Sequence, residues 1–362
     1  MANMSAPVGG AYGLITLQEN PHNAAPPKIS GSFLTDISQL FIRFNHAKQP
    51  LDPQNYFLSL HMPGGGINLT LKDLEKFQPV SYVSVFQCTG HRRPEFNAIA
   101  QTEGIQWPNA VANVNVNGYR LWDVLRSRGI HAEAGKYLIA EQLDEEGGTL
   151  FSSCIPLHLV PEDTLLATAL NDEPLDQDHG GPVRLFVPNW NAHFSVKDLR
   201  RIKIVSGDSV QIDPKHESLG EWAVAIALSK NLVPYIGYQG DKPFFDPELR
   251  VNSLAFANPE GVAVAPDAKE VSVKGFAWSG KGGIQSLQVS GDGETWVEGI
   301  VHFSPNHKYA WTRWTATLPI TEATDRVWIR ARDSAGNVQP KQADWSKRGT
   351  RNNSWTVVQI KR

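Results

Sequence analysis

Cys88 is the residue whose type and placement could most directly do chemistry. It follows the apolar run SYVSVFQ, which predicts a buried strand, and it opens the turn TGHRR, which carries Arg92 and Arg93. Neighbouring guanidinium groups favour the thiolate, which is the form of cysteine that binds metals or attacks electrophiles. A lone cysteine is more often a small buried hydrophobic residue, so these local features alone leave both interpretations open.

The sequence around Cys88 is one of an ordered set of motifs. FQCTGHRR resembles the Cys-Ala-Gly-Asn-Arg-Arg signature of the sulfite oxidase family of molybdenum-cofactor enzymes. Segments similar to that family follow in its order: GIQWPNAVANVNVNGYRLWDVL, SSCIPL, QDHGGPVRLFVPNWNAHFSVKDLRRIKI, VKGFAWSGKGGIQSLQVSGDGETW, RARDSAGNVQP and DWSKRGTRNNSW. The last three resemble the family's dimerisation domain. Because the set covers about residues 38–362, the chain is identified as a member, similar to bacterial sulfite oxidases and dehydrogenases.

The resemblance implies a molybdenum centre for which Cys88 supplies the protein's thiolate ligand. The other ligands would be the dithiolene sulfurs of molybdopterin and terminal oxygens. Thiolate suits soft metal centres generally, and the choice of molybdenum comes from the resemblance. A zinc site is not favoured, because the chain has no CxxC motif and the close pair His302 and His307 lies in an expected surface turn without sulfur partners.

The pterin and its phosphate need cationic and hydrogen-bonding partners. The resemblance assigns this role to Asn45, His46, Asp144, His179, Arg184, Ser195, Val196 and Lys197. Taken alone, each charged residue would more often be a solvated loop residue. Phe44 is an extra residue relative to the family's Arg-Asn-His, so we expect either Arg43 or the Asn45–His46 pair to be displaced from the site.

A small oxyanion such as sulfite needs several cationic groups beside the metal. The resemblance assigns its binding to Arg43, Arg93 and Arg348, with Trp107 as a rigid wall and an indole N–H donor. Arg348 also lies in a basic run with Lys347 and Arg351, which could be solvated surface. Cys154 is interpreted as a packing residue.

Two features bear on the reaction. The family's oxidising members carry a tyrosine about 20 residues after the Ser-Val-Lys segment, but residues 198–234 contain none, and Tyr235 and Tyr238 are the nearest. Fast sulfite turnover is therefore in doubt. We also expect no haem in this chain, because Met62 interrupts the haem-like HMPGGG and CxxCH is absent.

The elements that position these residues indicate an α+β molybdopterin-binding domain followed by an all-β immunoglobulin-like sandwich. Residues 1–30 are expected to form an extended N-terminal arm, and 31–249 the catalytic domain. In that domain, strand-like runs alternate with helical patterns at 69–77 and 121–130, and a connector at 205–249 holds one helical piece, GEWAVAIALSK. From 250 to 362 the period is two, as in EVSVKGFAW, IQSLQVS, WTRWTATLPI and RVWIRARD, which predicts a two-sheet sandwich.

Composition restricts the partners. The chain has 34 Lys+Arg against 37 Asp+Glu in 362 residues, a balance that is atypical of proteins that bind nucleic acid or anionic membranes. No apolar run is long enough to cross a bilayer, and the N-terminus as given does not resemble a signal peptide. Two cysteines exclude a disulfide-stapled mini-domain, and the compartment stays open.

Together these features predict an enzyme that moves an oxygen atom between water and a small anion, with oxidation of sulfite to sulfate as the favoured reaction. Electrons would pass to a separate acceptor such as a cytochrome c, and the chain would form a homodimer through its C-terminal domain. The alternatives are the same centre acting on another substrate, reduction of a sulfoxide or oxyanion, and a scaffold without catalysis.

Overall fold

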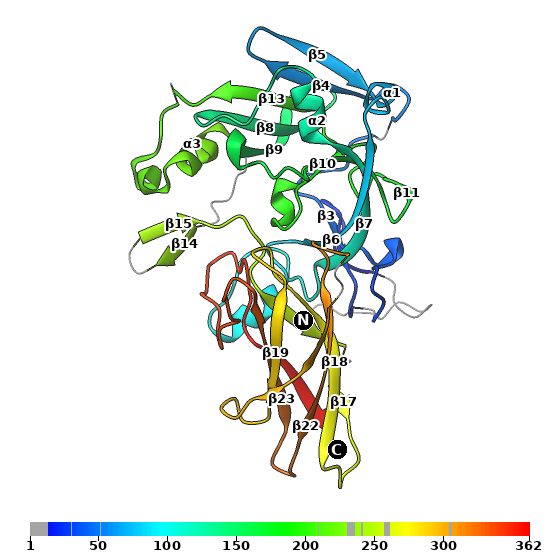
Figure 1. Cartoon of the computed structure of the whole chain (residues 1–362), viewed down its shortest axis with the longest axis vertical. Coiled ribbons are helices and arrows are strands. Elements are labelled where there is room, and N and C mark those ends of the chain that lie inside the picture. Colours follow the sequence, from blue (N-terminus) through cyan, green and yellow to red (C-terminus); the bar gives the residue numbers. More distant parts are fainter. Residues whose placement is uncertain are drawn as a thin grey trace.

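Two β-rich parts lie one after the other along the long axis of the molecule (Figure 1). The computed structural model describes residues 14–29, 31–50, 52–208, 210–229, 236–239, 242–256, 261–303 and 306–362. The first part holds the N-terminal 250 residues and three main sheets, and the second is a two-sheet sandwich. None of the described helices is long and apolar enough to cross a membrane.

Two five-stranded sheets enclose the core of the first part. One contains β11 (Glu173–Pro174), β10 (Leu165–Leu170), β7 (Val111–Arg120) and β6 (Pro79–Gln87), with β12 (Arg184–Phe186) also paired to β10. The other has the order β5 (Gly65–Thr70), β4 (Phe57–Met62), β13 (Arg201–Ser206), β8 (Lys136–Leu143) and β9 (Thr149–Pro156). The buried core contains Leu60, Trp122, Leu138 and Ile202, none more than 1% exposed. A separate pair, β14 (Ile236–Gln239) and β15 (Lys242–Phe245), lies in the predicted connector.

Helices contribute less than the predicted α+β class implies, because the fold is mostly β. The α-helices are α1 (Leu71–Leu74), α2 (Leu121–Arg126) and α3 (Glu221–Leu228), and the 3₁₀ turns are η1 (Ile37–Gln39), η2 (Arg93–Ala98), η3 (Leu157–Leu159), η4 (Ala192–Phe194) and η5 (Pro214–Leu219). The predicted helix at 69–77 is shorter than expected, because Leu69 and Thr70 end β5, which pairs with β4, and only Leu71–Leu74 form α1. Only one capped turn follows, at Thr70–Leu74. The helical piece in the connector is confirmed as α3.

The expected N-terminal arm contains ordered strands. β1 (Ile15–Gln18) and β2 (Asn23–Ala25) form an antiparallel hairpin, and β2 pairs with β3 (Ile42–Arg43). Ala24 and Ala25 are 1% exposed, so the segment is buried against the first part. A run this short gives no sustained period, which is why the sequence did not reveal it.

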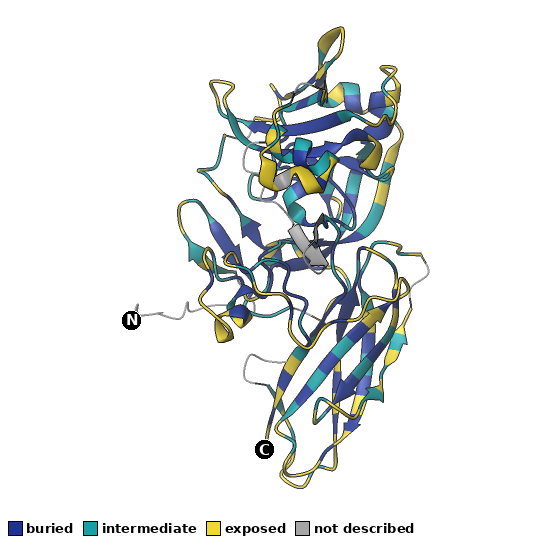
Figure 2. Cartoon of the chain, turned by 90° about the vertical axis from the view of Figure 1, so that its left-hand side faces the viewer, coloured by how far each residue is buried: buried dark blue, intermediate teal, exposed yellow. Residues whose placement is uncertain are grey.

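The sandwich follows the predicted period of two closely. One sheet has the order β16 (Asn252–Ala255), β18 (Glu270–Trp278), β22 (Thr312–Pro319) and β21 (Ile300–His302). The other has the order β17 (Val262–Ala263), β24 (Thr356–Lys361), β23 (Arg326–Asp333), β19 (Ile284–Ser290) and β20 (Val297–Glu298). Alternate residues such as Val271, Leu287 and Val327 form the core, visible as the alternation of dark blue and yellow along the strands (Figure 2).

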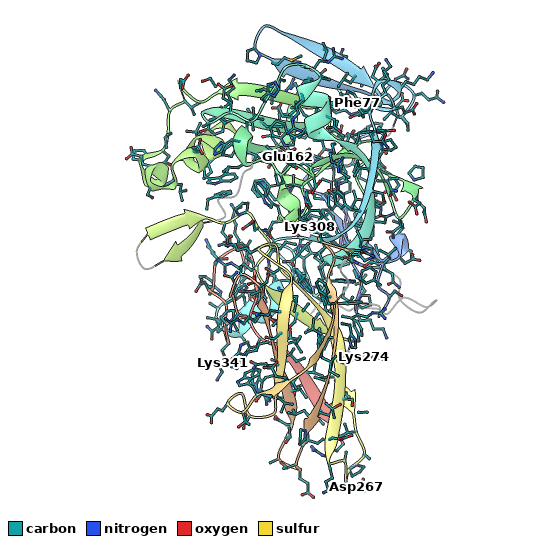
Figure 3. All side chains as sticks on the ribbon, in the orientation of Figure 1. Phe77, Glu162, Asp267, Lys274, Lys308 and Lys341 are labelled. Carbon is teal, nitrogen blue, oxygen red and sulfur yellow. The ribbon has the colours of Figure 1, made fainter. Side chains whose placement is uncertain are left out.

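The two parts share a buried interface at β6, the strand that leads to Cys88. Val85 and Val111 pack in one cluster with Phe276, Trp278 and Trp311, and the rings of Phe276 and Trp311 stack with centroids 4.0 Å apart. Lys308 marks the junction in Figure 3, where its ammonium group lies 3.7 Å from the carboxylate of Asp163. The sandwich therefore supports the end of β6 directly.

Candidate active site

Cys88 lies at the point where β6 ends. Its backbone N–H donates to Ala110 O over 2.9 Å, and its own carbonyl accepts from His91 N over 3.0 Å, which closes a tight turn. His91 is buried, and its Nδ1 accepts from Ala110 N over 3.0 Å. The thiol is half-buried and lines a cavity of about 820 Å³. The predicted emergence of a sulfur from a strand into a polar turn is therefore present in the fold.

The two arginines of the turn point to different places. Arg92 has a left-handed backbone (φ 60°), and its guanidinium donates to Glu95, to Asn252 Oδ1, and to the carbonyls of Ser354 and Trp355. It joins the two parts of the molecule. Arg93 lines the cavity beside Cys88, so only one of the two guanidinium groups faces the thiol's side of the turn.

Glycines make the space that Arg93 occupies. A Cβ at Gly90 would lie 2.5 Å from Arg93 Nη2, and a Cβ at Gly349 would lie 2.6 Å from Arg93 Cγ. The side chain donates to the carbonyls of Ile105 and Gly349. Burial lowers the pKa of Arg93, because the charged form is poorly solvated there.

Among the charged side chains in the described lining of the cavity, cations outnumber carboxylates. Arg43, Arg93, Arg184, Lys197 and Arg348 face it, and Glu103 is the one carboxylate among the described lining residues. Burial lowers the pKa of Arg184 to about 9, so it stays charged at neutral pH. Burial, followed by repulsion from Arg43, lowers the pKa of His193 to about 3. A cavity with this charge favours an anionic occupant.

One end of the cavity is formed by the predicted pterin-binding residues. Arg184 donates to the carbonyls of His179 (2.8 Å) and Ser195 (2.9 Å), which ties these segments together. His179 Nδ1 is 2.8 Å from Asp176 Oδ1, while its Nε2 is buried with no hydrogen-bond partner among the described residues. Lys197 Nζ lies 4.0 Å from the ring centroid of Phe44, and Val196 lines the same end.

The donor set at this end fits a pterin cofactor with a phosphate. It offers the buried, unpartnered Nε2 of His179, the fixed guanidinium of Arg184 and the ammonium group of Lys197, and the thiol of Cys88 lines the same cavity. Phosphate oxygens accept from such groups, and a heterocycle's polar edge can pair with the free imidazole nitrogen.

The first-strand motif reaches the cavity in full. Arg43, Asn45 and His46 all line it, and His46 Nε2 lies 3.0 Å from Gln142 Oε1. The expectation that one of them is displaced is wrong. Phe44, the extra residue, is 5% exposed and lines the cavity together with Arg43, Asn45 and His46. The insertion therefore does not remove any of these three residues from the lining.

The basic run near the C-terminus divides among three places. Lys347 is exposed and pairs with Glu103 over 2.9 Å, whereas Arg351 pairs with buried Asp246 over 3.4 Å. Arg348 lies between them and lines the cavity. Its segment is held to the first part by backbone bonds from Glu103 N to Lys347 O and from Arg351 N to Thr89 O. The second part therefore contributes directly to the cavity.

Two predicted residues lie elsewhere. Asp144 is in the turn between β8 and β9, where its Oδ1 accepts from the backbone N–H groups of Glu146 and Gly148. Its place is explained by turn formation, because a short acidic side chain caps such turns. Trp107 is fully buried against Phe41 behind Gly90 and does not form the cavity's described surface. Cys154 is buried in β9, and burial raises the pKa of its thiol, in agreement with a packing role.

The structure adds residues that the sequence did not single out. Gln142 and His193 line the cavity, as do Gln18 and Pro21 from the N-terminal hairpin. His193 comes two residues before Ser195, so its nearness to that motif was an available signal. No described lining residue is a tyrosine, and both Tyr235 and the side chain of Tyr238 lie outside what the structure describes.

Comparison with known proteins shows the family. Residues 46–212 match the family described as oxidoreductase molybdopterin binding domain, and residues 245–362 match the Mo-co oxidoreductase dimerisation domain. A sulfite oxidase of Arabidopsis thaliana is 31% identical over 95% of this chain and 92% of that protein. The chain belongs to the sulfite oxidase family of molybdopterin enzymes.

Two further relatives define the extent of the likeness within the sulfite oxidase family. A mitochondrial sulfite oxidase of Drosophila melanogaster is 29% identical over 95% of this chain and 62% of that protein, so the chain spans less than two thirds of its length. The crystal structure of the sulfane dehydrogenase SoxCD from Paracoccus pantotrophus has a TM-score of 0.73 at 22% identity. It covers 96% of this chain and 90% of that one, which shows a shared fold.

Proposed function

We propose that this chain is a molybdenum-dependent oxidoreductase that oxidises sulfite to sulfate with an oxygen atom derived from water. The observation that carries the proposal is a single cavity in which Cys88 faces Arg43, Arg93 and Arg348. A thiolate supplies a soft metal ligand, and three guanidinium groups match the charge and the oxygens of a small anion. Membership of the sulfite oxidase family supports the same reaction.

The residues divide into three roles in this proposal. Cys88 holds the metal, and His179, Arg184, Ser195, Val196 and Lys197 hold the pterin and its phosphate, with Asn45 and His46 at the adjoining wall. The bound cofactor supplies two-electron oxygen-atom transfer. Arg43, Arg93 and Arg348 bind the anion's oxygens and orient its sulfur toward the side of Cys88. Asp144 and Trp107 are given no contact with the cofactor or the anion, because neither is among the residues that line the cavity.

Replacement of Cys88 by Ser tests the role of the thiol. We expect turnover to be abolished, because a hydroxyl is a poor ligand for a soft centre, while the dithiolene sulfurs of the pterin keep about one molybdenum per chain. Pterin content should largely remain, since the phosphate contacts lie on other segments. Cys154→Ser is the matched control, because that cysteine is buried in β9 away from the cavity.

Metal analysis and sulfite assays would decide between the outcomes. Protein without molybdenum from a cofactor-competent host, or full activity in Cys88→Ser, would contradict the proposal. A protein rich in molybdenum that reduces a sulfoxide or another oxyanion, but does not oxidise sulfite, would keep the centre and change the substrate. A scaffold without catalysis would contain no molybdenum in the metal analysis and would show no turnover in the sulfite assay.

We also propose the partners and the assembly. Electrons would leave to a separate acceptor such as a cytochrome c, and no haem is assigned to this chain. The C-terminal sandwich is assigned to the immunoglobulin-like type from its short alternating strands, with its start near residue 250. The match of residues 245–362 to a dimerisation domain supports a homodimer through that part.

A further inference from the structure

The N-terminal hairpin forms part of the cavity wall and contains a fully buried amide. Gln18 and Pro21 line the cavity, and Asn23, on β2, is 0% exposed. Asn23 Nδ2 donates to Pro21 O over 2.7 Å and to Gln18 Oε1 over 3.1 Å. These two bonds fix the orientation of the amide, so its oxygen points away from the hairpin.

The Asn23 oxygen serves two groups of the neighbouring strand. Oδ1 accepts from Arg43 Nη1 over 3.1 Å and from Phe44 N over 3.1 Å. Asn23 and Arg43 are also directly opposed in the pairing of β2 with β3. A single buried atom thus holds both the guanidinium and the backbone of the extra residue, whose ring packs under Lys197.

The chemistry of Arg43's partners is informative. Among the described residues its hydrogen-bond acceptors are all neutral oxygens: Asn23 Oδ1, Phe44 O and Asn45 Oδ1. Across the cavity it faces other cations, and burial lowers its pKa. A carboxylate in place of the amide would orient Arg43 equally well but would neutralise it and compete with an incoming anion. A neutral amide holds the guanidinium and leaves its charge for the ligand.

We propose that Asn23 is a positioning residue that acts through Arg43 to set the affinity of the cavity for the substrate oxyanion. The N-terminal hairpin is then a working part of the active site. This inference rests on the proposed role of Arg43 in anion binding and adds to it a residue from outside the matched cofactor-binding region at 46–212.

Sulfate, as a product-like anion, is a direct probe in the cofactor-loaded enzyme. Its affinity is measured by isothermal titration calorimetry and the KM and kcat for sulfite in parallel. Asn23→Leu removes the acceptor and should weaken sulfate about 3–10-fold, the loss expected for one hydrogen bond. Asn23→Asp keeps the acceptor oxygen but loses the Nδ2 donor bonds to Pro21 O and Gln18 Oε1. It should weaken sulfate about 10-fold or more, beyond the effect of Asn23→Leu, because it also neutralises Arg43. In both variants KM should rise more than kcat falls.

Asn113 supplies the matched control. It is also 0% exposed and accepts at Oδ1 from a backbone N–H, that of Trp311, but it does not line the cavity. Asn113→Leu and Asn113→Asp should lower thermal stability without changing the affinity for sulfate. Equal weakening in the Asn113 and Asn23 variants would overturn the inference, since it would show a general structural effect.

Two further variants separate the possible failures. If Arg43→Met weakens sulfate but folded Asn23→Asp does not, the inference falls while the proposed role of Arg43 stands. If Arg43→Met leaves sulfate affinity unchanged, both the inference about Asn23 and the proposed role of Arg43 are contradicted. Should Asn23→Leu not fold, Gln18→Ala releases one bond that orients the amide and should weaken sulfate about 2–3-fold. Unchanged affinity in both Gln18→Ala and Asn23→Asp would overturn the inference.

Discussion

The anion site is assembled from arginines that lie far apart in the sequence. Arg43 ends β3, Arg93 begins η2, and Arg348 comes from the second part of the molecule. Arg43 and Arg93 donate to carbonyl or amide oxygens, Arg348 is exposed, and none of the three forms an ion pair with a carboxylate of the described residues. Like charges this close repel each other, so a bound anion relieves a cost that the protein carries when it is empty.

Arg348 offers the clearest test among these residues. Replacing it with Met should raise the KM for sulfite and lower kcat/KM. The loss of transition-state stabilisation calculated from kcat/KM should be about 2–5 kcal/mol, the range for truncating a charged group that binds an anion. Arg326→Met is the matched control, because Arg326 on β23 is 40% exposed, pairs with Asp325 and does not line the cavity. Steady-state kinetics in which both variants equal the wild type would return Arg348 to solvated surface.

The absent tyrosine predicts slow sulfite oxidation. A phenol near the reacting atoms can hold or move a proton, and losing such a group typically costs about 10²–10⁴ in rate. No described lining residue is a tyrosine. We expect sulfite turnover well below that of the Arabidopsis relative assayed alongside. Fast turnover in the wild type that neither Tyr235→Phe nor Tyr238→Phe slows would leave the argument without support.

At the scale of elements, the period of the sequence decided how much was predictable. β18, β19 and β23 coincide with the predicted runs, because a period near two over seven or more residues between turn signals is typical of a half-buried strand. The helix predicted at 69–77 was too long at both ends, since Leu69 pairs with β4 as part of β5 and only Leu71–Leu74 form α1. The hairpin at 15–25 escaped because its strands are too short to show a period.

The site was predictable where a motif places a backbone turn. Cys88, Arg93 and the segment from Ser195 to Lys197 line the cavity as expected, because each lies where a strand or short helix begins or ends beside it. Asp144 and Trp107 did not line it, since their motifs fix the chain position but not the direction of the side chain. Gln142, His193 and Asn23 depend on long-range packing that no local pattern encodes.

The pairing of β8 with β13 contains a buried ion cluster with a predicted pH dependence. Glu141 is 4% exposed and contacts Arg201 and Lys203 on β13. Burial raises the pKa of Glu141, but the hydrogen bonds from Arg201 and Lys203 outweigh it and hold the pKa below its ordinary 4.5. The charged form therefore stabilises the fold above that pH, and the contribution is lost as the pH falls through the lowered pKa.

Glu141→Gln should expose this contribution. At pH 7 the variant should lose about 1–3 kcal/mol, measured from the midpoint of the first urea transition. The gap between variant and wild type should narrow in a second measurement at acidic pH, as the pH falls through the lowered pKa of Glu141 and the wild-type carboxyl is protonated too. Glu133→Gln is the control, since Glu133 is 58% exposed and its pair with Lys136 should contribute little. An equal loss at both pH values would contradict the ionic origin.

At the scale of the whole molecule, the two parts depend on each other for one cavity. Trp278 and Trp311 of the sandwich pack against Val85 of β6, and the second part of the molecule also contributes Arg348 to the lining of the cavity. Arg92 joins them by donating to two carbonyls of the C-terminal segment. Movement of one part relative to the other would therefore change the distance between Arg348 and Arg93. Any assembly that shifts the sandwich would in this way change the arrangement of the cationic groups in the cavity.

The sandwich also presents an apolar edge that a second chain could cover. Ile300 on β21 is 65% exposed and Phe303 just after it is 71% exposed, and β21 is the edge strand of its sheet. Exposed edges with large apolar side chains usually have a partner. We expect light scattering to give twice the mass of one chain for the wild type, and a monomer for Ile300→Asp combined with Phe303→Asp. Val357→Asp, at a residue 39% exposed on β24, should leave the dimer intact. A double variant that remains dimeric would place the contact elsewhere, and a monomeric wild type would contradict the homodimer altogether.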